Sequence, residues 1–152
     1  FSKDEIEKHF DFYEPLTVHE SSLSPCVHSI LAASIDRMPK AYEQYLRTSR
    51  LDLDDYNHEV HEGLHITSMA GTWLSIVQGF GGMRNFHNKL SFNPQIPEEW
   101  KSYSFKLNYR GATIKVEKTQ DRCTYQNLTD TDVSIWLGDQ EHVLEANSAL
   151  SF

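Results

Sequence analysis

Cysteine and long apolar runs are both scarce in this sequence, and each shortage excludes a broad class of protein. The two cysteines, Cys26 and Cys123, are too few for a disulfide scaffold and lack the spacing of metal ligands. No stretch approaches the ~18 uninterrupted apolar residues of a membrane-spanning helix, and no signal peptide precedes Phe1. We therefore expect a cytoplasmic protein that has no membrane partner and that begins inside a longer chain.

Positive charge is also scarce. The 152 residues include 14 Lys and Arg against 22 Asp and Glu, a formal net charge of −8, and the basic side chains form no cluster. A nucleic-acid-binding surface needs such a cluster to neutralise phosphates, so nucleic acid is not an expected partner. Aromatic residues make up 12% of the chain, which excludes an intrinsically disordered protein.

Residues 1–89 have the spacing of helices joined by polar loops. Ser2 and Glu5 have the spacing of a capping box, which predicts a short first helix. Residues 11–24 lack a helical period, and we expect them to form a loop. The acidic, histidine-rich stretch 51–64 indicates a second long loop.

Two further helices are expected. The first follows Ser24, an N-cap residue before Pro25, and the second follows Pro39. The face that the first of these helices buries is expected to comprise Val27, Ile30, Leu31 and Ser34. The clearest helical period follows, with Thr67 or Ser68 as the N-cap and Trp73 and Phe80 in the core.

From residue 90 onward the apolar period becomes two, which is typical of strands with one buried face. The expected strands are residues 103–109, 122–128, 133–137, 141–144 and a tail to Phe152. A further strand with Ile114 and Val116 is expected after a turn at Arg110 and Gly111. They predict an antiparallel sheet or sandwich over residues 90–152.

The start of the helix near Thr67 has the residue types of an anion site. The first amides of a helix lack intrahelical partners and lie at the positive end of the dipole. Small side chains at Ala70 and Gly71 allow an oxyanion to approach the backbone closely. His65 can donate a hydrogen bond or carry charge. Inorganic phosphate fits this set, although the residues alone favour a simpler interpretation. In that interpretation Ser68 is only a cap and Gly71 only lets helices pack closely.

Two other groups of residues are candidates for chemistry. His61, Glu62 and His65 match H-E-x-x-H, the zinc-protease pattern, but Gly63 disfavours the helix that this pattern requires, so we expect no metal ion. His19, Glu20 and Ser21 lie in an expected loop, where they either contact sugar hydroxyls or face solvent.

Several blocks of sequence resemble the C-terminal part of glycoside hydrolase family 65, and together they cover nearly the whole chain. The blocks are Phe10–Ser24, Leu51–Asn57, Glu62–Trp73, Gly79–Arg84, Leu90–Pro94 and Trp100–Phe105. The resemblance implies that residues 1–89 are the last helices of an (α/α)₆ catalytic barrel. Residues 90–152 would then form a small C-terminal antiparallel β-sandwich domain.

The resemblance also implies a reaction, the inverting phosphorolysis of maltose to β-glucose 1-phosphate and glucose. Phosphate is already an anionic nucleophile, so such an enzyme needs a general acid and an anion site but no general base. The implied cosubstrate is inorganic phosphate, with no cofactor. The implied phosphate-binding residues are His65, Thr67, Ser68 and Gly71, and His19, Glu20 and Ser21 match a loop at the mouth of the active site.

The family's general acid is a glutamate upstream of this region, so no catalytic residue is expected in this chain. The implied partners are the disaccharide, phosphate, the missing N-terminal part of the protein and a second copy in a homodimer. Two alternatives stay open. One is a hydrolase of the same family similar to acid trehalase, and the other is a non-catalytic sugar-binding or structural module.

Overall fold

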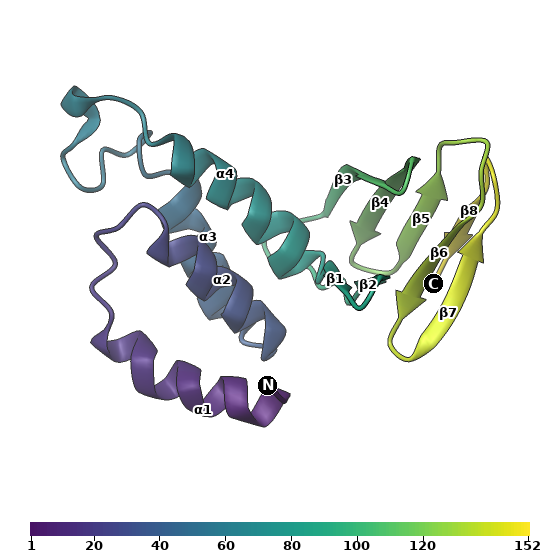
Figure 1. Ribbon diagram of the computed structural model, residues 1–152. Helices are drawn as coiled ribbons and strands as arrows, with labels where there is room; N and C mark the ends of the chain where they lie inside the picture. Colours follow the sequence, from purple (N-terminus) through teal and green to yellow (C-terminus); the bar gives the residue numbers. More distant parts are fainter. The chain divides into compact units, whose positions relative to one another are not determined.

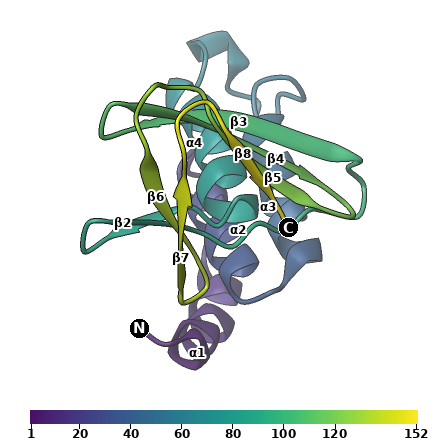
Figure 2. The ribbon, with the colours of Figure 1, turned by 90° about the vertical axis from the view of Figure 1, so that its right-hand side faces the viewer.

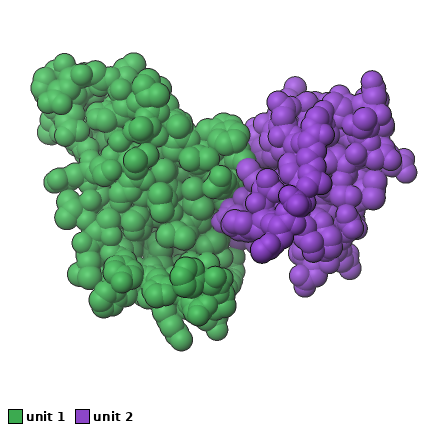
Figure 3. All heavy atoms as spheres, in the orientation of Figure 1, with its two compact units in different colours: residues 1–79 green, residues 80–152 purple.

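The computed structural model describes residues 1–152 and divides into two compact units, residues 1–79 and 80–152 (Figure 3). All four α-helices precede all eight strands, as Figure 1 shows, so the expected change from helix to sheet is confirmed. The second unit begins at Phe80, before the expected boundary at residue 90. No helix is both long enough and apolar enough to cross a membrane.

The helical unit is built around α2, which packs against α1, α3 and α4. Its α-helices are α1 (Lys3–Tyr13), α2 (Ser24–Ser34), α3 (Met38–Ser49) and α4 (Ile66–Leu74). Short 3₁₀ segments cover Glu14–Leu16 and Val60–Glu62, and a π-helical segment, Ser75–Phe80, continues α4. The expected loop over residues 51–64 therefore contains only one 3₁₀ turn.

Helix α1 begins with the predicted capping box. The Ser2 hydroxyl accepts from the Glu5 amide at 3.3 Å, and the Glu5 carboxylate accepts from the Ser2 amide at 2.7 Å. The helix continues through Tyr13 and a 3₁₀ turn follows over Glu14–Leu16, so the loop expected over residues 11–24 is wrong for its first six residues. Tertiary contacts hold this end, because Phe10 is buried and Asp11 pairs with an arginine that precedes α3.

Helix α2 buries a face of small residues rather than the predicted apolar face, and Val27 is half exposed. The buried residues are Pro25, Cys26, Ser29, Ala32 and Ala33. Small side chains let α3 approach closely, and the Ser29 hydroxyl donates to Ala41 O at 2.8 Å. Ser24 is the first helical residue and not the N-cap, because its hydroxyl contacts an imidazole instead of a backbone amide.

Helix α4 begins at Ile66 with His65 as its N-cap, so the predicted N-cap at Thr67 or Ser68 is wrong. Its buried positions are Ser68 and Gly71, whereas the predicted core residue Trp73 is 47% exposed. The reason is again close packing on α2. A Cβ atom at Gly71 would lie 2.8 Å from the Cβ of Cys26.

The second unit has two four-stranded sheets, with strand orders β1-β2-β6-β7 and β3-β4-β5-β8 (Figure 2). The first sheet comprises β1 (Arg84–Phe86), β2 (Lys89–Phe92), β6 (Val133–Leu137) and β7 (Gln140–Leu144). The second comprises β3 (Ser102–Tyr109), β4 (Ala112–Thr119), β5 (Cys123–Asn127) and β8 (Ala149–Ser151). Alternating burial along β4, β5 and β6 confirms the predicted period of two.

The predicted all-antiparallel arrangement is wrong at one place, because β2 pairs with β6 in parallel. The hairpin of β1 and β2 was not expected from the sequence. Its turn contains His87 and Asn88, both at positive φ (51° and 64°), which is the geometry of tight two-residue hairpin turns. This hairpin adds to the edge of a sheet whose other strands come from the end of the chain.

Candidate functional site

The first turn of α4 lies against the loop that precedes α2. The hydroxyl oxygens of Ser22 and Thr67, 45 residues apart in the chain, are 2.8 Å from each other. The Asn57 side chain also donates to Glu20 O at 3.0 Å. Two groups that the sequence predicted separately, the loop at His19 and the turn at His65, therefore belong to one region of the helical unit.

His65 is held from one side by Asp52. The imidazole Nδ1 is 2.6 Å from Asp52 Oδ1, and the His65 amide donates to Asp52 Oδ2 at 2.9 Å. The hydrogen bond to the Asp52 carboxylate raises the pKa of His65, and the same contact lowers the pKa of Asp52. This geometry favours an imidazolium ion at the N-terminus of α4.

The other imidazole nitrogen of His65 faces a carboxylate that is half exposed. Glu59 Oε2 lies 3.4 Å from His65 Nε2 and 3.4 Å from Asn57 Nδ2. Glu59 therefore occupies the outer side of the imidazole, which is the position that an anionic ligand of His65 would take. Because both contacts are long and Glu59 is 47% exposed, this carboxylate is easily displaced.

Most amides of the first turn of α4 already have acceptors. The Ile66 amide donates to Leu64 O at 3.1 Å, and the Ser68 amide donates to His65 O at 2.9 Å. The amide of Thr67 has no such acceptor, and the Thr67 side chain is exposed. The donors available to an anion are therefore fewer than predicted and centre on Thr67.

Ser68 and Gly71 lie on the buried side of the same helix. The Ser68 hydroxyl donates to Thr48 O at 2.6 Å, and Ser68 is only 3% exposed. Gly71 is in contact with Cys26 of α2. The structure therefore brings His65 and Thr67 to the surface and directs Ser68 and Gly71 into the helix packing.

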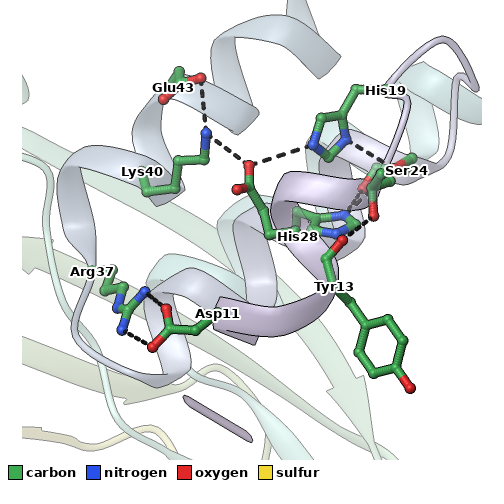
Figure 4. Close-up of polar contacts among 10 residues, drawn as sticks. Asp11, Tyr13, His19, Ser24, His28, Arg37, Lys40 and Glu43 are labelled. Carbon is green, nitrogen blue, oxygen red and sulfur yellow. Dashed lines mark hydrogen bonds and ion pairs between the residues drawn. The ribbon is translucent and has the colours of Figure 1, made fainter. Parts of the chain in front are cut away.

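The three predicted loop residues are also divided between surface and interior. Glu20 and Ser21 are exposed, whereas the side chain of His19 is only 11% exposed. His19 Nδ1 is 3.0 Å from the Ser24 hydroxyl (Figure 4). Its Nε2 is directed toward Glu14. His19 is thus part of a polar network beneath the loop.

Four residues beside His65 and Thr67 were not predicted as part of the site: Ser22, Asp52, Asn57 and Glu59. For Ser22, Asp52 and Asn57 the only signal was their place in the blocks that resemble the family, whereas Glu59 lies between two of these blocks. None of the four has a recognisable spacing relative to His65. The neighbouring acid Asp54 instead pairs with Arg50 at 2.6 Å.

The H-E-x-x-H pattern does not form a helical pair of ligands. His61 and Glu62 end a 3₁₀ turn, and Gly63 follows at φ 126°, so His61 and His65 do not share a helical turn. His61 is 76% exposed. The geometry that a zinc protease requires is therefore not formed by these residues.

Two family models match the sequence in the order that the fold indicates. The glycosyl hydrolase family 65 central catalytic domain matches residues 1–74, and the family's C-terminal domain matches residues 83–144. The chain belongs to glycoside hydrolase family 65. The helical unit therefore corresponds to part of the family's catalytic domain, and the strand unit to its C-terminal domain.

Several proteins that are similar to this chain are named as phosphorylases. The chain is 56% identical over 126 residues to the maltose phosphorylase of Bacillus subtilis, covering 83% of this chain and 17% of that protein. It is 46% identical over 145 residues to the α,α-trehalose phosphorylase of Thermoanaerobacter brockii, covering 95% of this chain and 19% of that protein. The chain thus spans about a fifth of the length of these relatives.

A solved structure of a human-microbiome protein has the same fold. It is 34% identical to this chain and superposes with a TM-score of 0.93. The match covers 100% of this chain and 22% of the other. The mixture of helices and two sheets described above is therefore shared with that structure over the full length of the chain.

Proposed function

We propose that this chain is the C-terminal segment of an inverting α-glucoside phosphorylase and that it supplies part of the phosphate-binding site. The observation that supports this best is the pairing of His65 with Asp52 at the start of α4, next to the exposed Thr67. An imidazolium, a hydroxyl and a free amide at a helix N-terminus all favour an anion. The named activities of the similar relatives agree with this chemistry.

In the proposed reaction, phosphate attacks the anomeric carbon of the glucoside from the face opposite the leaving sugar. His65 Nε2 and the Thr67 hydroxyl and amide would hold the anion, which takes the position of the Glu59 carboxylate. Ser22 lies within reach of the same anion because its hydroxyl contacts Thr67. A phosphate nucleophile needs no general base, so a general acid is the only further proton-transfer group required.

Ser68 and Gly71 are proposed to act by fixing the position of the helix backbone and not by contacting phosphate. Both were predicted to bind phosphate, and both lie on the packed side of α4. We propose that their buried contacts fix the turn that presents His65 and Thr67. Glu20 and Ser21, which are exposed on the neighbouring loop, would face the sugar at the mouth of the site.

Maltose is the proposed substrate, with inorganic phosphate as cosubstrate and no other cofactor. The support for maltose is the 56% identity to a maltose phosphorylase, against 46% and 36% to a trehalose and a kojibiose phosphorylase. We further propose a cytoplasmic enzyme that forms homodimers.

The general acid and the rest of an (α/α)₆ barrel are proposed to lie in other parts of a longer protein. The helical unit exposes many large apolar side chains, which a monomeric surface rarely gathers in such number. Examples are Phe12 (63%), Leu16 (69%), Val18 (69%), Leu53 (77%), Leu64 (63%) and Ile66 (67%). Further barrel helices would cover such a surface.

The test is the phosphate dependence of disaccharide cleavage by the full-length protein that contains this chain. We expect His65→Gln and Thr67→Val to raise the phosphate KM by about tenfold or more, and the maltose KM to change little. His61→Gln is the matched control, because it changes an exposed imidazole of the same loop. Glucose release at full rate without phosphate would instead indicate a hydrolase and refute the proposal.

A further inference from the structure

The imidazole of His19 is buried at a point where three helical elements meet, beneath the loop formed by Glu20, Ser21 and Ser22. Its Nδ1 is 3.0 Å from the hydroxyl of Ser24 at the start of α2. Its Nε2 is fully buried and lies 3.5 Å from Glu14 Oε1, a polar contact that lacks hydrogen-bond geometry.

Glu14 is fixed in turn by α3. Lys40 Nζ lies 2.8 Å from Glu14 Oε1. It also lies 3.2 Å from a carboxylate oxygen of Glu43 (Figure 4). The Lys40 ammonium lowers the pKa of Glu14, so the carboxylate that faces His19 is ionised. The His19 imidazole is therefore held between an anchored carboxylate and a hydroxyl.

The other side of His19 packs against His28 of α2. The two rings meet edge to face with their centroids 4.6 Å apart, and His28 Nδ1 is 2.9 Å from Ser24 O. Burial lowers the pKa of His19, with a smaller contribution from His28, so the imidazole is neutral under ordinary conditions. A neutral, enclosed ring is suited to holding a loop and not to binding an anion.

Side chains from other parts of the helical unit contact the loop between His19 and Ser22, which leads to the proposed phosphate site. Arg47 Nη2 donates to His19 O at 2.6 Å, and its guanidinium stacks over the Tyr56 ring at 4.6 Å. Arg47 forms no ion pair with a carboxylate. Beyond His19, the loop is held by Asn57 at Glu20 O and by the contact between Ser22 and Thr67.

We propose that His19 is a positioning residue for phosphate, which sets the loop from Glu20 to Ser22 against Thr67 without touching the substrate. This inference rests on the proposed function of the turn at His65 and Thr67. The imidazole is the one side chain that ties the start of this loop to both Glu14 and Ser24. Its loss would let the Ser22 hydroxyl move away from the anion, and small displacements of positioning groups have large kinetic effects.

The test compares substitutions of His19 in the full-length protein. His19→Phe keeps an aromatic ring but loses both polar contacts, and we expect it to raise the phosphate KM about tenfold. The turnover number and the maltose KM should change less than about threefold. His19→Gln retains polar atoms that can reach Ser24, and we expect it to restore phosphate KM to within about threefold of wild type.

Ser24→Ala removes the partner of His19 Nδ1 and should raise the phosphate KM in the same direction. Combined with His19→Phe it should add little, because both changes remove the same contact between His19 Nδ1 and the Ser24 hydroxyl. His9→Phe is the matched control, since His9 is an exposed histidine of α1. If His19→Phe does not fold, the phosphate KM of Ser24→Ala decides the question.

The outcomes separate this inference from the proposed function. If Thr67→Val raises the phosphate KM and the folded His19 and Ser24 variants do not, the positioning role is refuted and the phosphate site stands. Equal losses in turnover and in both KM values would show a general packing role and also refute it. If Thr67→Val has no effect on phosphate, the proposed function itself is wrong.

Discussion

Replacing Ser68 by alanine separates a packing role from a phosphate-binding role. The Ser68 hydroxyl is buried and donates to Thr48 O at 2.6 Å. Thr48 lies in the last turn of α3, where carbonyl groups have no intrahelical donor. The substitution leaves a buried acceptor unsatisfied, which costs about 1–3 kcal/mol. The better helix propensity of alanine offsets roughly 0.5 kcal/mol of this loss.

We therefore expect Ser68→Ala to lower the free energy of unfolding by about 0.5–2.5 kcal/mol. The assay is chemical denaturation followed by circular dichroism, with Thr67→Ala as the control. Thr67 is exposed on the same turn, so its substitution should change stability by less than about 0.5 kcal/mol. An unchanged stability for Ser68→Ala, together with a raised phosphate KM as large as that of Thr67→Val, would refute the packing role.

Three further predictions follow from the site and from the strand unit. Asp52 raises the pKa of His65 above its ordinary value of 6.5, so the imidazolium is lost only as pH rises beyond that value. Asp52→Asn should therefore shift the loss of phosphate use to lower pH in a pH profile of kcat/KM, and an unshifted profile would contradict this. Glu59→Ala should lower the phosphate KM in steady-state kinetics, because no carboxylate then competes for His65; a raised value would mean that Glu59 helps to bind substrate. Asn127 is fully buried, and its amide nitrogen donates to three backbone carbonyls at 2.8–3.2 Å. Asn127→Leu should lower the free energy of unfolding by about 2–4 kcal/mol in denaturation experiments, whereas a loss below about 1 kcal/mol would contradict the assigned network.

Local patterns predicted the parts of the fold in which neighbours along the chain decide the structure. Strand β6 was predicted with its observed bounds, Val133–Leu137. One face of this strand is buried, so apolar and polar residues alternate along the sequence. The buried face of α2 was mispredicted because it consists of small residues, which carry little apolar signal. Only the approach of α3 and α4 explains why Cys26 and Ala32 are buried and Val27 is not.

The candidate site was predictable to a similar extent. His65 was found because it stands directly before a helix start. Its partner Asp52 lies 13 residues earlier in an acidic stretch, and only the fold brings the two side chains together. A hydroxyl that caps its own helix and one that donates to another helix look alike in sequence, so the contact from Ser68 to Thr48 could not be predicted.

A crystal structure of the full-length protein with inorganic phosphate bound would test the central proposal most directly. We predict tetrahedral density within hydrogen-bonding distance of His65 Nε2 and the Thr67 hydroxyl, with the Glu59 carboxylate moved away from the imidazole. Phosphate bound in the active site away from α4, with Glu59 still beside His65, would contradict the account.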